Sequence, residues 1–86
     1  MNQFTPNHIH ELVLIRAKHV EEGCRAVLEV RSQKTVLLDL SGMDNAQAQR
    51  TTDFVCGGIE ALDGGQHRLD EHVFLFTPSG IQVTLN

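Results

Sequence analysis

Short runs of consecutive apolar residues alternate with segments of helical periodicity along most of this chain. The strongest run, 73–77, reads Val-Phe-Leu-Phe-Thr and is typical of a buried strand. In 18–31 and 45–62, apolar residues recur three or four positions apart, which is typical of helices. The pattern predicts, in chain order, strands at 10–16, 34–40, 66–69, 73–77 and 81–85, with helices at 18–31 and 45–62.

The two predicted helices have recognisable ends and sides. Asp44 is a suitable N-cap for the second helix, and Gln47, three residues on, completes a pair resembling a capping box. Gly64 and Gly65 offer a glycine for the left-handed residue that often follows a helix. The residues expected to face the core are Val20, Cys24, Val27 and Val30 in the first helix and Ala48, Val55, Ile59 and Leu62 in the second.

These elements predict an α/β (α+β) two-layer sandwich. A mixed sheet of about five strands carries both helices on one face, in the order β-α-β-α-β-β-β. Because strands such as 12–15 and 36–38 are apolar at consecutive positions, they are apolar on both faces and need both covered. Two helices cover only one face, and soluble monomers rarely expose a large apolar patch. We therefore expect a second copy to cover the open face in a two-fold dimer.

Composition is that of one small domain. The 86 residues fit a polar lead-in or linker at 1–9 and a core domain at 10–86. No apolar run approaches the ~20 residues that span a bilayer, and a net charge of −4 argues against nucleic-acid binding. Cys24 and Cys56 lack the spacing of a metal or redox pair, so we predict free thiols that serve as small core residues of a cytoplasmic protein.

Candidate catalytic groups do not combine into a site. His8 and His10 form a His-x-His pair without further ligands at a metal-binding spacing. Cys56 precedes two glycines but is predicted to lie mid-helix, where a thiolate is not stabilised. Asp39 and Asp44 could form a carboxylate pair, although capping explains Asp44 better. The sequence therefore indicates a non-catalytic interaction module, with no catalytic residue, no metal and no cofactor.

Three motifs carry a specific resemblance. They are AQRxxDF at 48–54, ALDG at 61–64 and FLFTP at 74–78, and they occur in this order after the strand at 37–40. Together they closely resemble the core domain of the SepF family of cell division proteins over about residues 11–84. Two positions depart from the family pattern: Asp70 stands where glycine is usual, and Cys56 stands where alanine is usual.

The resemblance implies a bacterial septation protein at the division site. SepF-like proteins bind the C-terminal tail of FtsZ, the tubulin-like division GTPase, and self-assemble from dimers. They tether FtsZ filaments to the membrane through a separate N-terminal amphipathic helix. We therefore expect an FtsZ C-terminal peptide and further copies of the chain as partners. We find no such helix in these residues, so we expect a core domain whose membrane contact depends on a segment outside it.

The resemblance also suggests which residues bind the FtsZ tail. Arg68 and Phe74 fall on the family's strand positions for arginine and phenylalanine. Arg68 would pair with an acidic side chain of the tail, and Phe74 would anchor its apolar residues. Phe76 would either extend this pocket or fill the core.

A self-association surface is predicted on the second helix. Gly57 and Gly58 each cost a helix about 1 kcal/mol relative to alanine, and a close approach by another helix or subunit would explain them. With Phe54, these glycines form a surface that, together with the sheet face, would permit polymers.

Two other interpretations stay open. The strand at 36–42 is similar to the strand of STAS-like anti-sigma-antagonist domains that leads to a phosphorylated serine, which points to Ser41, but the Asp-Ser-Ser/Thr-Gly element is missing. The enzyme alternative is a small metallo-hydrolase that uses His8, His10 and a carboxylate.

Overall fold

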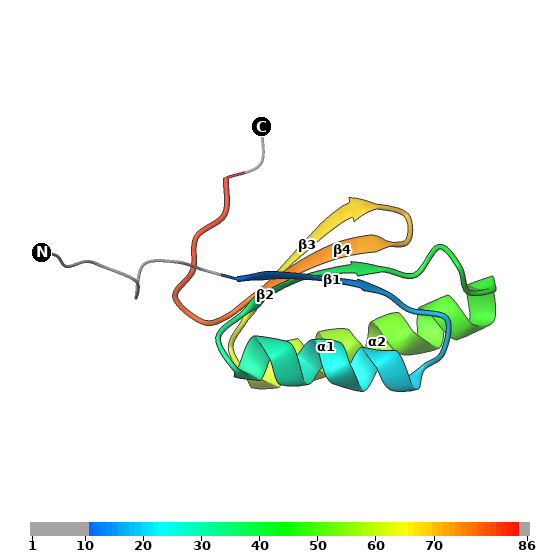
Figure 1. Cartoon of the computed structure of the whole chain (residues 1–86), viewed down its shortest axis with the longest axis horizontal. Coiled ribbons are helices and arrows are strands. Elements are labelled where there is room, and N and C mark those ends of the chain that lie inside the picture. The colour runs from blue at the N-terminus through cyan, green and yellow to red at the C-terminus, as the bar shows by residue number, and fades with distance from the viewer. Residues whose placement is uncertain (1–10, 85–86) are drawn as a thin grey trace, which may run out of the picture.

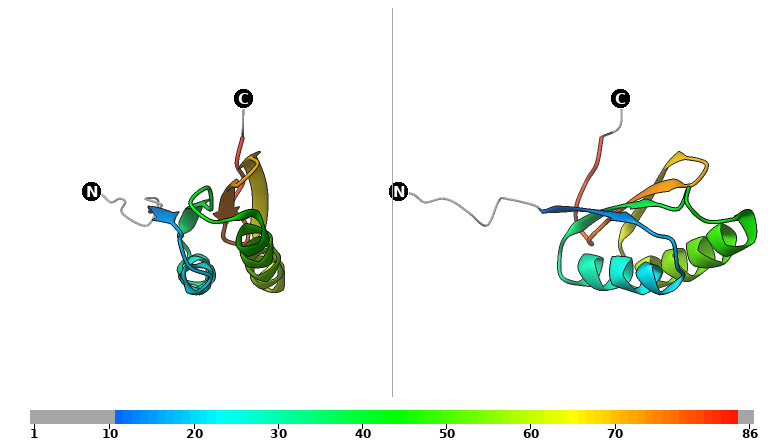
Figure 2. Two further views of the ribbon diagram at one scale, coloured as in Figure 1. Left: turned by 90° about the vertical axis from the view of Figure 1, so that its right-hand side faces the viewer. Right: turned by 45° about the vertical axis from the view of Figure 1, so that its right-hand side comes forward.

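The computed structural model describes residues 11–84. Its elements follow the order β1 (Leu12–Arg16), α1 (Glu21–Arg31), β2 (Thr35–Asp39), α2 (Asn45–Ala61), β3 (Gly65–Asp70) and β4 (Val73–Thr77). Both helices lie on one side of the sheet, so the fold has two layers (Figures 1 and 2). The predicted α+β sandwich is therefore confirmed, with element bounds that differ by up to three residues at the start of α1.

The sheet has four strands in the order β1-β2-β4-β3. β1 runs parallel to β2, whereas β4 runs antiparallel to both β2 and β3. The prediction of about five strands, with the last at 81–85, is wrong: residues 81–84 form no strand, and residue 85 lies outside the described residues. The segment cannot continue the antiparallel run by pairing with β4, because β4 already has a neighbour on each side.

The core lies between the sheet and the helices. Residues that face each other across β2 and β4 point to the same side, and the pairs Val36–Phe76 and Leu38–Phe74 both point to the helices. These four residues are buried. The buried residues of the helices are Gly23, Ala26, Val30, Ala48, Thr51, Val55 and Ile59.

Capping residues set both ends of α2. The Asp44 carboxylate accepts a hydrogen bond from the Gln47 amide at 2.8 Å, which confirms the predicted N-cap. The predicted glycine at the other end is wrong, because Asp63 adopts the left-handed conformation with φ of 59°. Gly64 is needed for another reason: a Cβ there would lie 2.6 Å from the carbonyl oxygen of Thr77.

α1 and α2 pack closely through glycines. A Cβ on Gly23 would lie 2.9 Å from a methyl of Val55, and one on Gly58 would lie 2.9 Å from a methyl of Val27. Because Gly23 lets α2 approach, the buried side of α1 is centred on Gly23, Ala26 and Val30. Cys24 is consequently exposed, and its predicted core role is wrong.

The opposite face of the sheet carries no helix or strand of the described chain (Figure 2). Register places Leu14, Leu37 and Leu75 side by side across β1, β2 and β4 on this face. Leu14 is 54% exposed, and Leu12 on the same face is 62% exposed. The expected surplus of apolar surface is therefore present on the open face, which we define by Leu12, Leu14, Leu37 and Leu75.

Candidate interaction surfaces

Arg68 and Phe74 lie directly opposite each other on β3 and β4. The guanidinium carbon of Arg68 lies 5.3 Å from the centre of the Phe74 ring, which is the geometry of a cation–π interaction. The Phe74 ring in turn stacks on Phe76, with ring centres 5.9 Å apart and an interplanar angle of 10°. The structure therefore brings the three predicted tail-binding residues into one cluster, which we call the Arg68 cluster.

The β3–β4 turn holds the guanidinium in place. Nη2 of Arg68 donates to the carbonyl of Glu71 at 2.6 Å, and Nε donates to the carbonyl of Asp70 at 3.4 Å. The side chain of Asp70 accepts the Glu71 amide at 2.8 Å, so the aspartate at this unusual position fastens the same turn. A guanidinium fixed in this way gives up little further freedom when it binds an anion.

The Arg68 cluster faces α2. Gln66, also on β3, donates to the carbonyl of Cys56 at 3.2 Å and so ties the strand to the helix. Burial raises the pKa of the Cys56 thiol, the charge of Asp53 raises it further, and the positive charge of Arg68 opposes both. The guanidinium therefore contributes positive potential between β3 and α2.

The three residues differ in their access to a partner. Arg68 is exposed, Phe74 is 5% exposed and Phe76 is fully buried at 0%. Only Arg68 and an edge of the Phe74 ring can touch a bound peptide without a rearrangement. Phe76 supports the Phe74 ring from within the core.

The outer side of the helices carries the predicted self-association residues. Phe54 is 49% exposed. Gly57 is also exposed, and a Cβ added there would meet no atom within 4 Å. Gly58 belongs to the contact with Val27 of the same chain, so its glycine is explained within one copy. Sequence analysis did not identify Leu28, which is 48% exposed on α1. The signal that could have identified it is its position one helical turn after Cys24, which is also exposed.

A cavity of about 300 Å³ lies at the carboxyl ends of β1 and β2, away from the predicted site residues. The Ser41 hydroxyl donates to Asp39 at 2.7 Å and the Ser41 amide donates at 2.9 Å. These two hydrogen bonds lower the pKa of Asp39. The positive charge of Arg16, whose Nε lies 3.9 Å from Oδ2 of Asp39, lowers this pKa further. The Asp39 carboxylate accepts from Ser41, whereas the Asp44 carboxylate caps α2, so each carboxylate has its own hydrogen-bond partner. The cavity is lined by Arg16, Ala17, Lys18, Asp39, Ser41 and Gly42.

Metal-binding groups and membrane-spanning helices are both missing from the described part of the chain. No group of three or more His, Cys, Asp or Glu side chains between residues 11 and 84 could hold a metal ion. His8 and His10, on which the metal alternative depended, lie outside these residues, as does the predicted lead-in at 1–9. Among the helices of the described residues, none is long and apolar enough to cross a bilayer.

Comparisons with known proteins point to one family. The family described as "Cell division protein SepF" matches residues 12–83, a span that includes the Ser41 strand on which the STAS-like alternative rested. The cell division protein SepF of Nostoc punctiforme is 47% identical over 78 residues, which cover 91% of this chain and 39% of that protein. The corresponding protein of Trichodesmium erythraeum is 48% identical over 77 residues, which cover 90% of this chain and 37% of that protein. This chain thus spans well under half the length of these relatives.

Solved structures share the fold. A SepF-like protein from Archaeoglobus fulgidus superposes with a TM-score of 0.78 at 20% identity, covering 88% of this chain and 94% of that one. A cell division protein SepF from Methanobrevibacter smithii, solved in complex with FtsZ-CTD, superposes with a TM-score of 0.70 at 19% identity, covering 90% and 100%. At these identities, the likeness establishes the two-layer fold.

Proposed function

The chain belongs to the SepF family of cell division proteins, and we propose that it is the non-catalytic core module through which such a protein binds the C-terminal tail of FtsZ. The observation that carries this proposal is the Arg68 cluster. Its guanidinium is exposed, held over an aromatic ring and fastened by two carbonyls. A fixed cation beside an apolar ring suits a short peptide that presents an acidic residue next to apolar ones.

A titration of the purified chain with an FtsZ C-terminal peptide tests the Arg68 cluster. Arg68→Glu reverses the charge at the proposed contact, and we expect the dissociation constant to rise at least about tenfold, which corresponds to about 1.4 kcal/mol. Arg50→Glu is the matched control, because it makes the same change at an exposed position of α2. Equal binding by the Arg68→Glu and Arg50→Glu variants would remove Arg68 from the site.

Phe74 needs a milder substitution because it is nearly buried. Phe74→Leu keeps an apolar side chain but loses the ring beneath the guanidinium. We expect weaker peptide binding with an unchanged circular dichroism spectrum. Undiminished binding by a folded Phe74→Leu variant would mean that the ring is not part of the tail site.

We further propose that copies of the chain associate through two surfaces. The open face (Leu12, Leu14, Leu37 and Leu75) would pack on its counterpart in a two-fold dimer. The helix surface around Phe54 and Gly57 would join dimers into polymers. Light scattering tests both: a monomer at micromolar concentration contradicts the dimer, and a Gly57→Lys variant of unchanged assembly size contradicts the helix surface.

At the level of the whole protein, we propose that this module helps to organise FtsZ filaments in the cytoplasm at the division septum. Tethering to the membrane would depend on an N-terminal amphipathic helix, not on residues 11–84. A fluorescent fusion of the full-length protein should therefore localise to the septum in an FtsZ-dependent way. Septal localisation that survives Arg68→Glu and FtsZ depletion would contradict this role.

A further inference from the structure

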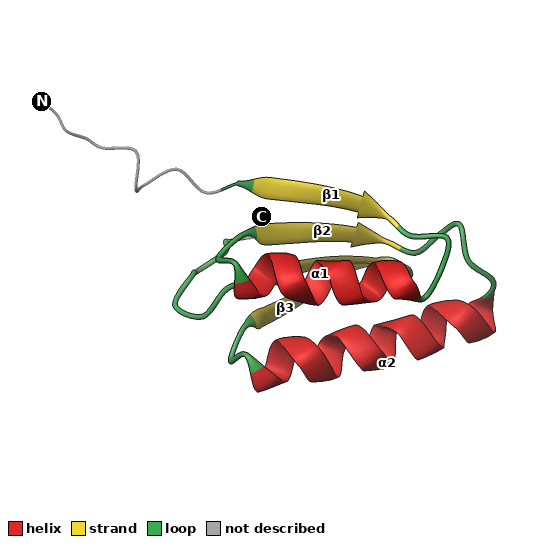
Figure 3. Ribbon diagram, turned by 60° about the horizontal axis from the view of Figure 1, so that its bottom comes forward, coloured by secondary structure: helices red, strands yellow, loops and turns green. Residues whose placement is uncertain are grey.

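The β3–β4 hairpin closes through a two-residue turn, Glu71-His72. β3 is an outer strand of the sheet and lies along α2 (Figure 3). Two-residue hairpins favour turns with a positive φ at one or both central residues, because these turns match the twist of the strands. Neither Glu71 nor His72 has a positive φ. The turn therefore fits the strand twist less well, and side-chain hydrogen bonds at this end of the hairpin carry more weight.

Asp70 supplies one of these hydrogen bonds. Its Oδ1 accepts the amide of Glu71 at 2.8 Å. The carbonyl of Glu71 accepts Nη2 of Arg68 at 2.6 Å, and the carbonyl of Asp70 accepts Nε at 3.4 Å. The aspartate side chain thus fixes the backbone segment whose two carbonyls hold the guanidinium. A glycine, which is usual at this position of the SepF pattern, has no side chain to accept the Glu71 amide.

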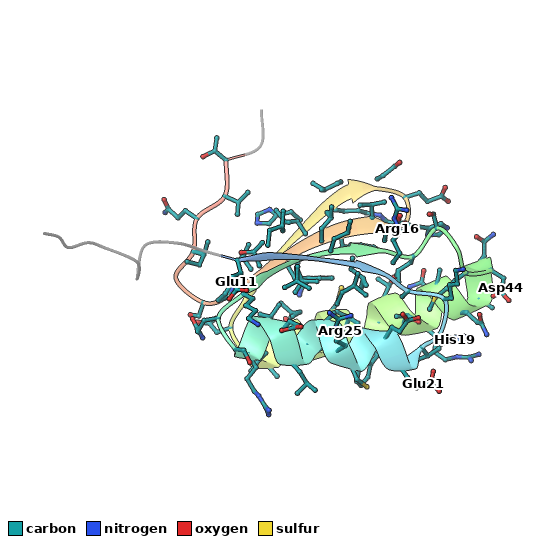
Figure 4. The ribbon with its side chains drawn as sticks, viewed as in Figure 1. Glu11, Arg16, His19, Glu21, Arg25 and Asp44 are labelled. Atoms are coloured by element: carbon teal, nitrogen blue, oxygen red, sulfur yellow. The ribbon has the colours of Figure 1, made fainter. Side chains whose placement is uncertain are left out.

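The far side of the turn is fastened to other elements. The carbonyl of His72 accepts the amide of Leu40 at 2.8 Å, and Nε2 of His72 lies 3.3 Å from Oδ1 of Asn45. Asn45 begins α2 directly after Asp44, which Figure 4 labels at that end of the helix. Because these contacts do not involve Asp70, a change at Asp70 should loosen the near side of the turn while the hairpin stays in place.

β3 carries one extra residue directly after Arg68. Arg68 lies opposite Phe74 and Asp70 lies opposite Val73, so β3 has one more residue than β4 between the two pairs. This is the residue count of a β-bulge, which bends a strand locally and can redirect a side chain. Since the ladder is interrupted at this point, the hydrogen bonds of the turn largely set where the guanidinium points.

The guanidinium of Arg68 keeps a free edge. Nε and one N–H of Nη2 donate to the turn, and these two nitrogens form one edge of the planar group. The other edge, formed by Nη1 and the second N–H of Nη2, has no acceptor among the described residues. No carboxylate of residues 11–84 lies within 4 Å of these nitrogens. An edge with two parallel N–H groups matches both oxygens of a carboxylate.

We propose that Asp70 is a positioning residue of the tail site: it fixes the turn that holds Arg68, and so keeps the free edge of the guanidinium in place for a carboxylate of the bound peptide. This inference rests on the proposed function, since it concerns the same site. A guanidinium held in advance loses less side-chain freedom on binding. The Asp70 carboxylate is not itself the contact, because it accepts the Glu71 amide and carries the same charge as an acidic tail.

Two substitutions at Asp70 separate positioning from charge. Asp70→Asn and Asp70→Ala remove the same negative charge, but only asparagine keeps an oxygen that can accept the Glu71 amide. The probe is an FtsZ C-terminal peptide, titrated into each purified variant at one ionic strength. We expect the dissociation constant of the Asp70→Ala variant to be at least about threefold higher than that of the Asp70→Asn variant. Equal dissociation constants would overturn the positioning role.

Removing either partner of the proposed contact distinguishes positioning of Arg68 from a general effect of alanine. In an Arg68→Met background, the Asp70→Asn and Asp70→Ala variants should bind the peptide equally, because no guanidinium is left to orient. A C-terminally amidated peptide whose Asp and Glu residues are replaced by Asn and Gln should also bind the two Asp70 variants equally. A difference that persists in either case would mean that Asp70 acts by another route and would contradict the proposal.

The orientation of Arg68 can also be measured without the peptide. Nitrogen relaxation at Nε, followed by NMR in the free chain, should show a more rigid side chain for Arg68 than for Arg50, which is exposed on α2. This rigidity should persist in the Asp70→Asn variant and be lost in the Asp70→Ala variant. Equal mobility of Arg68 and Arg50 in the unsubstituted chain would refute the proposal, and this comparison decides where Asp70→Ala does not fold by circular dichroism.

The proposed function and the positioning role fail in different ways. If the Arg68→Glu variant binds the peptide as well as the Arg50→Glu variant does, Arg68 lies outside the tail site and both fail. If Arg68→Glu weakens binding but the two Asp70 variants bind alike, the tail site stands and only the positioning role fails.

Discussion

Two adjacent glycines of α2 offer a direct test of how closely the helices pack. Gly57 and Gly58 both lie well within α2, away from its ends, but their surroundings differ. A Cβ on Gly57 would meet no atom within 4 Å, whereas a Cβ on Gly58 would lie 2.9 Å and 3.1 Å from the two methyls of Val27. We predict that alanine raises the free energy of unfolding at Gly57 but gives no gain, or a loss, at Gly58.

The magnitudes follow from propensity and packing. Alanine in a helix interior is favoured over glycine by about 1 kcal/mol, so Gly57→Ala should be stabilising by about that amount. Gly58→Ala has the same gain, but it forces a methyl against Val27, whose β-branched side chain has one preferred rotamer in a helix. Overpacking of this kind costs about 1–3 kcal/mol. Both variants gain the same helix propensity. The difference of about 1–3 kcal/mol between their free energies of unfolding therefore measures the contact with Val27.

Urea and thermal unfolding followed by far-ultraviolet circular dichroism measure both variants. For a domain of this size, 1 kcal/mol shifts the melting temperature by roughly 4–8 °C. The measurements belong at two protein concentrations, because association at Gly57 would raise the apparent stability of the unsubstituted chain. If Gly58→Ala stabilises the protein as much as Gly57→Ala does, the close approach of α1 and α2 is wrong. A Val27→Ala background should restore the gain at Gly58.

Three further predictions concern single groups. The buried Thr77 hydroxyl has no hydrogen-bond partner among the described residues, so Thr77→Val should raise the free energy of unfolding by about 1 kcal/mol in urea titrations. Cys24 is exposed and burial raises the pKa of Cys56, so iodoacetamide at pH 8 should label Cys24 first, as peptide mapping would show. Hydrogen bonds from Ser41 lower the pKa of Asp39 in the folded state. Its stabilising contribution is therefore present above about pH 4 and lost as the pH falls through the lower folded pKa. In the Asp39→Asn variant, the free energy of unfolding measured from pH 7 to 2 should fall less steeply at acid pH than in the unsubstituted chain.

The local elements of the fold could be predicted because each has a strong local cause. The strand at 73–77 was predicted with its observed bounds, and Asp44 caps α2 as its position before the apolar stripe indicates. The errors arose where tertiary structure decides. Cys24 fits a helical apolar stripe, but the small side of α1 at Gly23 faces α2 instead. The segment at 81–84 has a strand-like pattern, but β4 has no free edge for it.

The candidate surfaces also combine features that the sequence predicts with features that only the tertiary structure determines. Continuous apolar strands predicted an uncovered sheet face, and the exposed Leu12 and Leu14 confirm the surplus. The family resemblance pointed to Arg68 and Phe74, but only the β3–β4 register places the guanidinium over the ring.

The two faces of the sheet separate the proposed roles in space. Register places Leu14, Leu37 and Leu75 on the open face, whereas Arg68 lies opposite Phe74 on the side of the helices. A two-fold pair that packs through the open face would therefore leave the Arg68 cluster of each copy free. Two tails tethered to one filament would meet two sites on one body, and the second binding step would become intramolecular. Loss of the dimer would then lower the avidity for filaments while leaving the affinity for a single peptide unchanged.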